Sequence, residues 1–121
     1  MKKVLIYNGD MELLGSLQAC LEHFDFSVQT VTGKPEFYKN LEEYKPDVVM
    51  IDVMLHGTDG RTVCRSLKDD KKYSHHPVIL FACSSNLLHD YKNNGADGIL
   101  EMPFEINDIG PLVNSVIEKR N

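Results

Sequence analysis

Residues 46–60 read PDVVMIDVMLHGTDG, and the first half of this segment has the pattern of a buried strand. Val48 to Ile51 are all apolar, which is typical of a strand whose two faces are both covered. Asp52 follows directly, and Gly57 and Gly60 then indicate a loop. Ligands of open parallel sheets bind beyond the carboxyl ends of the strands. The position of Asp52 therefore makes it a candidate functional residue.

Similar strands alternate with amphipathic stretches along the whole chain. Four more apolar runs predict strands at residues 4–7, 26–31, 78–82 and 99–100. Helical spacing predicts helices over residues 10–23, from near Pro35 to before Pro46, around Val63, Cys64 and Leu67, from Ser84 or Ser85 to Asn94-Gly95, and from Asn107 or Asp108 through Ile117. Pro111 fits only the first turn of the last helix. The alternation predicts one α/β domain over residues 1–121, with a five-stranded parallel sheet between helices.

Length and composition exclude several classes of protein. A chain of 121 residues, 42% hydrophobic and 26% charged, can bury a core without disulfides or a structural metal. The net charge of −5 and the pI near 5.4 argue against nucleic acid or an anionic membrane as partner. No apolar run is long enough to span a membrane, and the first residues lack the apolar stretch of a secretory signal. We therefore expect a cytoplasmic protein.

Cysteines and a charge run have plain structural interpretations. Cys20, Cys64 and Cys83 are predicted to be small buried apolar residues, with a redox role for Cys83 as the alternative. The run from Lys68 to Lys72 is predicted to be a solvated helix end. Neither feature predicts a function.

Three segments at the strand ends carry a family pattern. They read PDVVMID with MLHGTDG at residues 46–52 and 54–60, PVILFAC at 77–83, and GADGILEMPF at 95–104. In this order they resemble the response-regulator receiver family of two-component signalling. The resemblance implies a flavodoxin-like, doubly wound (βα)5 sandwich of three layers, in which Asp52 accepts a phosphoryl group from a histidine kinase. It also makes the Met102–Pro103 bond a candidate cis peptide, and His56 replaces the usual proline of the family.

The positions that assist phosphoryl transfer in the family carry other residues here. The acidic pair that holds Mg²⁺ falls on Asn8 and Gly9. The hydroxyl residue of the fourth strand, the lysine of the fifth-strand signature and the aromatic switch residue fall on Ala82, Met102 and Ile99. Met102 is either a hydrophobic plug or a neutral packing change. Losses of both charge signs around one carboxylate predict that Asp52 is poorly phosphorylated.

Magnesium binding is accordingly expected to be weak. Asp52 would be the main anionic ligand, and the resemblance adds the backbone carbonyl of Met54. Asp10 lies one residue beyond the acidic-pair positions. It is either a further metal ligand or, more simply, the N-cap of the following helix.

Three functions are compatible with these residues. The first is a non-enzymatic receiver in phosphorelay signalling, with a histidine kinase or another signalling protein as partner. The second is a phosphate-independent pseudo-receiver that acts as an interaction module. The third, a flavodoxin-like cofactor-binding enzyme, is disfavoured because residues 7–11 supply little of the phosphate-binding loop that a flavin needs. The units from Ser84 onward resemble the dimer or partner face of the family, so a homodimer is a hypothesis.

Overall fold

A parallel sheet forms the centre of the molecule. The computed structural model describes residues 1–9 and 11–119, except for the side chains of residues 11–14. Within this part the main sheet has the order β2-β1-β3-β6-β7, and every neighbouring pair is parallel. Its strands are β1 (Lys3–Tyr7), β2 (Ser27–Val31), β3 (Val48–Asp52), β6 (Val78–Ala82) and β7 (Gly98–Glu101). The predicted five-stranded parallel sheet is confirmed.

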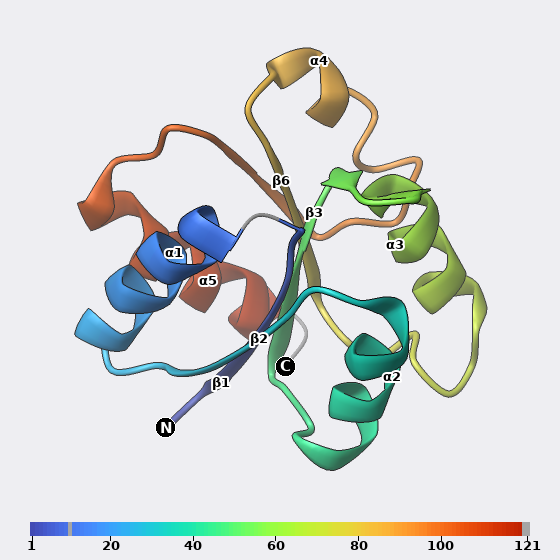
Figure 1. The fold of residues 1–121 in the computed structure, drawn as a ribbon, viewed down its shortest axis with the longest axis horizontal. Helices are drawn as coiled ribbons and strands as arrows, with labels where there is room; N and C mark the ends of the chain where they lie inside the picture. Colours follow the sequence, from blue (N-terminus) through green and yellow to red (C-terminus); the bar gives the residue numbers. More distant parts are fainter. Residues whose placement is uncertain (10, 120–121) are drawn as a thin grey trace.

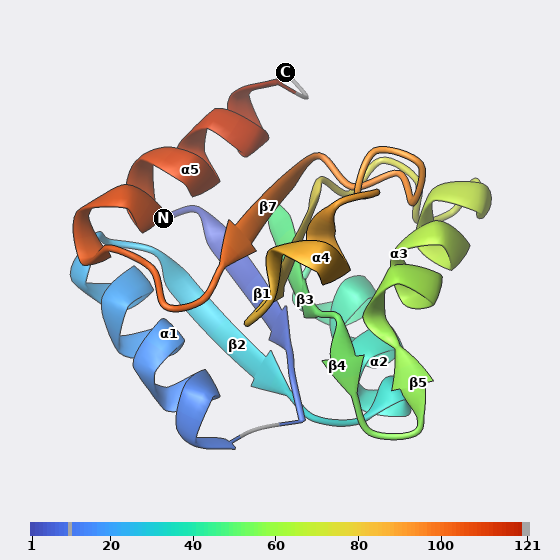
Figure 2. The ribbon, with the colours of Figure 1, turned by 90° about the horizontal axis from the view of Figure 1, so that it is seen from above.

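Helices cover both faces of this sheet (Figures 1 and 2). One face is covered by α1 (Met11–His23) and α5 (Ile106–Lys119), and the other by α2 (Lys34–Glu43) and α3 (Gly60–Asp69). Pro35 lies in the first turn of α2, as predicted. No helix among the described residues is both long and apolar enough to cross a membrane.

The two apolar layers explain why the central strands contain no polar residue before their ends. Val48 and Met50 pack on the side of α1 and α5, whereas Val49 and Ile51 pack on the side of α2 and α3. Successive strand residues point to opposite faces, so a strand between two helical layers must be apolar at every position. Asp52 is the only polar residue of β3, and it lies at the carboxyl end of this central strand.

The helix predicted to end at Asn94-Gly95 is much shorter than expected. It comprises only α4 (Ser85–Leu88), and turns follow as far as Gly95. Asp90 explains the early end: its carboxylate accepts a hydrogen bond from the Asn93 side chain, and its carbonyl accepts one from the Asn94 side chain. Asp and Asn side chains that bond the local backbone compete with helix formation.

The prediction for Pro111 was also wrong. Because α5 begins at Ile106, Pro111 lies in its second turn rather than its first. The proline removes only the amide that would bond to the carbonyl of Asn107. Asn107 is exposed, so water can satisfy that carbonyl.

A small hairpin replaces the loop expected after β3. It pairs β4 (Met54–Leu55) with β5 (Thr58–Asp59) in antiparallel register. Asp59 then caps α3, accepting a hydrogen bond from the amide of Arg61 at 2.9 Å. Gly60 allows this close return of the chain, because a Cβ atom there would lie 2.0 Å from the carbonyl oxygen of Asp52. The hairpin is thereby folded onto the end of β3.

The charge run that begins in the last turn of α3, from Lys68 to Lys72, is not uniformly solvated. The Lys68 ammonium donates to the Asp97 carboxylate at 2.8 Å and to the carbonyl of His76 at 2.7 Å. Only 15% of the Lys68 side chain and 19% of the Asp97 side chain are exposed. Lys68 thus ties α3 to the start of β7, and the prediction of a solvated end is wrong at this residue.

Candidate functional site

A pocket of about 590 Å³ lies at the carboxyl ends of β1, β3 and β6. This is the place where the strand order reverses between β1 and β3, and where parallel α/β sheets bind their ligands. Its lining residues are Asn8, Gly9, Asp52, Met54, Leu55, His56, Phe81, Ala82, Cys83 and Met102. The sheet and the β4–β5 hairpin therefore build it together.

Asp52 supplies the carboxylate of this pocket. It is the last residue of β3 and is 8% exposed. Its Oδ1 atom accepts a hydrogen bond from the backbone amide of Met54 at 2.9 Å. Among the described lining residues, no other side chain is acidic and none is a lysine or arginine.

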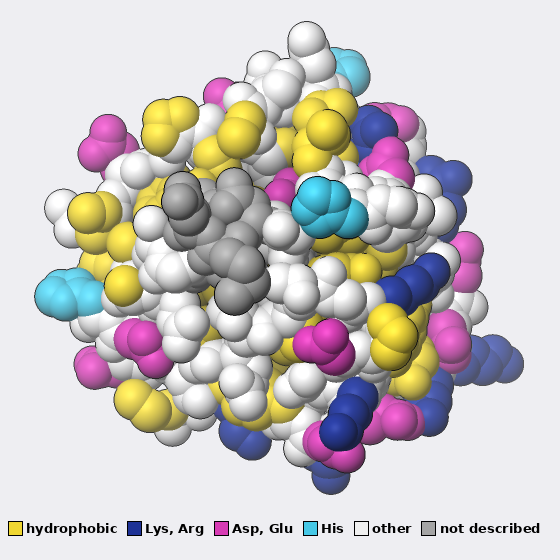
Figure 3. Space-filling model, viewed as in Figure 1, with side chains coloured by type: hydrophobic (Ala, Val, Ile, Leu, Met, Phe, Trp, Pro, Cys, Tyr) yellow, Lys and Arg dark blue, Asp and Glu magenta, His cyan; other side chains and the backbone are white. Residues whose placement is uncertain are grey.

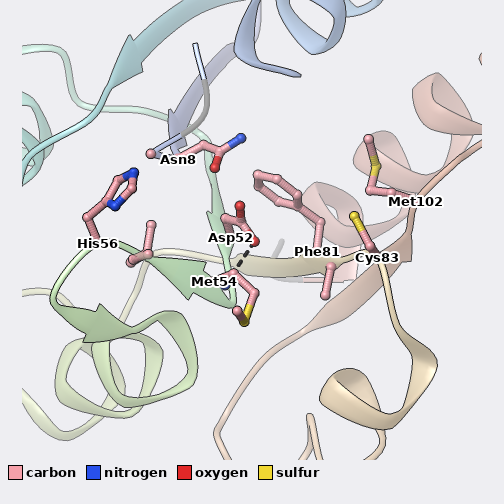
Figure 4. A pocket seen from close by; sticks show the side chains of 10 residues that line it. Asn8, Asp52, Met54, His56, Phe81, Cys83 and Met102 are labelled. Carbon is pink, nitrogen blue, oxygen red and sulfur yellow. Dashed lines mark hydrogen bonds between the residues drawn. The ribbon is translucent and has the colours of Figure 1, made fainter. Parts of the chain in front are cut away.

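The pocket has a polar side and an apolar side. Figure 4 shows Asn8 and His56 on one side of Asp52, and Phe81, Cys83 and Met102 on the other. Asn8 is fully buried, and its backbone N–H donates to the carbonyl of Val31 at 3.1 Å. On the apolar side, Ala82 and Met102 are both buried.

The structure brings together most of the residues singled out in the sequence. Asn8, Gly9, Asp52, Ala82 and Met102 all line the pocket. Ile99 is not among the lining residues: it lies on β7 and is 36% exposed, and its role as the switch position stays a prediction. Its exposure arises because β7 forms the edge of the sheet, where one row of side chains faces outward. The Met102–Pro103 bond is cis.

Sequence reasoning missed the contact between His56 and Gly9. A Cβ atom built on Gly9 would lie 2.4 Å from Cδ2 and 3.0 Å from Nε2 of the His56 ring. The imidazole therefore occupies the space that a side chain at position 9 would need. The sequence shows a histidine at position 56 where the resemblance leads one to expect a proline. It does not show in which direction the ring of His56 points.

The described donors do not suit a Mg²⁺ ion. Mg²⁺ prefers six oxygen ligands in near-ideal octahedral geometry, usually including carboxylates. Here Asp52 offers one carboxylate, Asn8 an amide group and Met54 a backbone carbonyl, while Gly9 offers no side-chain donor. No group of three or more His, Cys, Asp or Glu among the described residues could hold a metal ion. Asp10 lies outside the described residues, so its role as ligand or helix cap stays a prediction.

The cysteines differ from the prediction. Cys64 is buried, and burial raises the pKa of its thiol to about 12. Cys20 is only partly buried, and Cys83 is exposed. Cys83 follows the last residue of β6, beyond the reach of the covering helices, so the prediction of burial was wrong there.

Positive charge gathers away from the pocket. Figure 3 shows Lys and Arg side chains mainly toward the right and lower edges of the view, over α2 and α3. A second cleft of about 410 Å³ lies on that side, near Pro46, Lys72 and His76. None of the residues seen to line the Asp52 pocket in the described part of the chain is a lysine or an arginine.

Comparisons with known proteins agree with the fold. Residues 4–114 match the model of the response regulator receiver domain. The chain is 27% identical over 120 residues to the alkaline phosphatase synthesis transcriptional regulatory protein PhoP of Bacillus subtilis, covering 98% of this chain and 49% of that protein. It thus spans about half the length of this relative.

Two solved structures show the same architecture. A sensor protein from Polaromonas sp. JS666 superimposes with a TM-score of 0.90 at 16% identity, covering 99% of this chain and 98% of that one. A response regulator receiver domain protein from Clostridium thermocellum gives a TM-score of 0.86 at 22% identity, with coverage of 99% and 97%. At these identities the likeness concerns the fold alone.

Proposed function

Because the chain belongs to the response regulator receiver domain family, we propose that residues 1–121 form a single receiver domain of phosphorelay signalling in which Asp52 holds the phosphoacceptor position but is poorly phosphorylated. The observation that supports this proposal is the position of Asp52 in the pocket. It ends β3 and is the one acidic side chain lining the pocket among the described residues. Receiver domains are signalling modules that accept phosphoryl groups and interact with histidine kinases and other signalling proteins.

The expected weakness follows from the chemistry of transfer. A carboxylate oxygen of Asp52 would bond to phosphorus while the P–N bond of the phosphohistidine donor breaks. The transition state spreads negative charge over three equatorial oxygens, which need nearby cations and hydrogen-bond donors. Ala82 and Met102 offer neither, and the described donors do not suit Mg²⁺. Each lost electrostatic contact of this kind costs about two to three orders of magnitude in rate.

One observation favours a phosphate-independent pseudo-receiver as the second candidate. Phe81, Ala82 and Met102 form an apolar wall beside Asp52, and the His56 ring rests on Gly9. An apolar lining of this kind suits contact with a protein partner that binds the domain without phosphorylation. The hypothesis of a homodimer through the last two units stays open, with exposed Ile99 and Ile106 on that part of the molecule.

Phosphorylation by a small donor tests the proposal directly. We expect the chain, incubated with acetyl phosphate and Mg²⁺, to show little or no added phosphate by intact mass, whereas an active receiver treated in parallel is labelled. Asp52→Asn is the matched control. Ready, Mg²⁺-dependent labelling that disappears in Asp52→Asn would show that Asp52 is a competent acceptor and contradict the proposal.

A further inference from the structure

We propose that His56 keeps the pocket unsuited to Mg²⁺ by occupying the space that an acidic side chain at position 9 would need. Gly9 and His56 then form a coupled pair, and restoring an acidic residue at position 9 does not by itself restore a Mg²⁺ site. The inference concerns the same pocket as the proposed function and rests on it, but it is tested through metal binding rather than phosphorylation.

The contact geometry excludes a side chain at position 9 while the ring is in place. The ideal Cβ position at Gly9 lies 2.4 Å from Cδ2 and 3.4 Å from Cγ of His56. Non-bonded carbon atoms pack at about 3.5–4.0 Å. Even alanine at position 9 therefore requires the imidazole to move, and an aspartate carboxylate would extend still further into the volume of the ring.

The hairpin backbone gives no reason for a histidine at this place. His56 and Gly57 connect β4 to β5, and Gly57 has a φ of +74°. A positive φ at the second central position is typical of a type II turn, whose first central position favours proline. The turn would accept proline at position 56, so the turn geometry does not require a histidine there.

An imidazole at position 56 in place of a carboxylate at position 9 changes which metal ligands the pocket offers. Mg²⁺ binds oxygen donors, whereas imidazole is a borderline ligand that suits transition metals. If the ring swings outward to admit an aspartate at position 9, the imidazole can still pair with the new carboxylate and compete with Mg²⁺. Both residues must therefore change before the oxygen donors can act together.

Calorimetric titration with Mg²⁺ and Mn²⁺ tests the coupling in four proteins. They are the unaltered chain, Gly9→Asp, His56→Pro and the double variant Gly9→Asp/His56→Pro. We expect the double variant to bind Mg²⁺ about tenfold more tightly than Gly9→Asp alone, a coupling of the size found for residues in contact, and His56→Pro alone to bind no better than the unaltered chain. Equal affinities of Gly9→Asp and the double variant would overturn the proposal.

Two further sets of variants serve as controls. Gly15→Asp adds a carboxylate to α1 where a new Cβ meets no atom within 4 Å, and His23→Ala removes an exposed imidazole at the end of the same helix. Combined, these changes should give no coupling. If Gly9→Asp does not fold, thermal unfolding of Gly9→Ala gives a second measurement. We expect alanine at position 9 to lower the unfolding temperature in the presence of His56 and not in His56→Ala; equal shifts would refute the steric contact.

The outcomes separate this inference from the proposed function. Labelling of the unaltered chain at Asp52 would contradict the proposed function whatever the titrations show. Absence of metal coupling between positions 9 and 56 would contradict the inference even if the unaltered chain remained unlabelled.

Discussion

The two ends of the sheet differ in how their acidic side chains are bonded. At the amino ends of β6 and β7, the Asp97 carboxylate accepts hydrogen bonds from Lys68 at 2.8 Å and from the amide of Val78 at 2.9 Å. At the carboxyl ends, Asp52 lines a cavity of about 590 Å³ beside apolar Phe81. One carboxylate is held by an ion pair that joins helix to strand, and the other faces space that a ligand or partner can enter.

The histidines of the two ends differ in the same way. His76 is buried beside Pro46, to whose carbonyl its ring donates, whereas His56 is exposed on the hairpin. At the amino end these polar residues bond within the fold, whereas at the carboxyl end Asp52 and His56 line a pocket. The identity of a residue does not reveal which role it has; its place along the strand does.

Neutralising the two aspartates tests this comparison with the largest expected effect. We expect Asp97→Asn to lower the free energy of unfolding by about 2–3 kcal/mol, because it leaves the Lys68 ammonium poorly compensated in a largely buried site. Asp52→Asn should cost less than about 1 kcal/mol, since an amide oxygen can still accept from Met54. Urea denaturation measures both changes.

An exposed ion pair provides the control for that experiment. Lys72 and Glu42 are paired on the surface with about half or more of each side chain exposed, so Glu42→Gln should produce no measurable loss. A loss in Asp52→Asn as large as in Asp97→Asn would remove the distinction between the two ends.

A smaller, pH-dependent effect is expected at His76. Burial, followed by the neighbouring His75 and Lys68, lowers the pKa of His76 to about 4, against the raising effect of the bond to Pro46. The unfolded chain binds a proton near pH 6.5 and the folded chain does not, so this stability is present above pH 6.5 and is lost as the pH falls toward 4. From pH 7 to pH 5 we expect a loss of about 2 kcal/mol.

Urea unfolding at both pH values measures this loss. His76→Gln should remove that part of the pH dependence, while His75→Gln, at an exposed position, should retain most of it. An unchanged pH dependence in His76→Gln would show that His76 does not carry it.

The smallest effect concerns thiol reactivity. We expect iodoacetamide at pH 8 to modify Cys83 rapidly in the folded chain, because this thiol is exposed at the rim of the pocket. Cys64 should react only after denaturation, since burial raises its pKa to about 12 and almost no thiolate forms. Intact mass over time measures the adducts, and Cys20→Ser removes the partly buried third thiol. Slow labelling of Cys83 would indicate that the rim is closed.

The regular elements could be predicted from local patterns alone. Val48 to Ile51 had to form a strand covered on both faces, and their parallel neighbours followed from the alternation of strand and helix. The short α4 could not be predicted, because side chains of Asn93 and Asn94 bond to Asp90 in place of a longer helix. The spacing of apolar residues does not indicate where side-chain hydrogen bonds compete with a helix.

Sequence alone determined that an acidic residue, Asp52, follows an all-apolar strand at the carboxyl end of a parallel sheet. The strand is recognisable in the sequence because a strand that is buried on both faces needs an apolar residue at every position. Only the tertiary structure decided that the His56 ring covers Gly9 and that Lys68 pairs with Asp97. Both contacts join residues distant in the chain, and the directions of their side chains depend on how the completed elements pack.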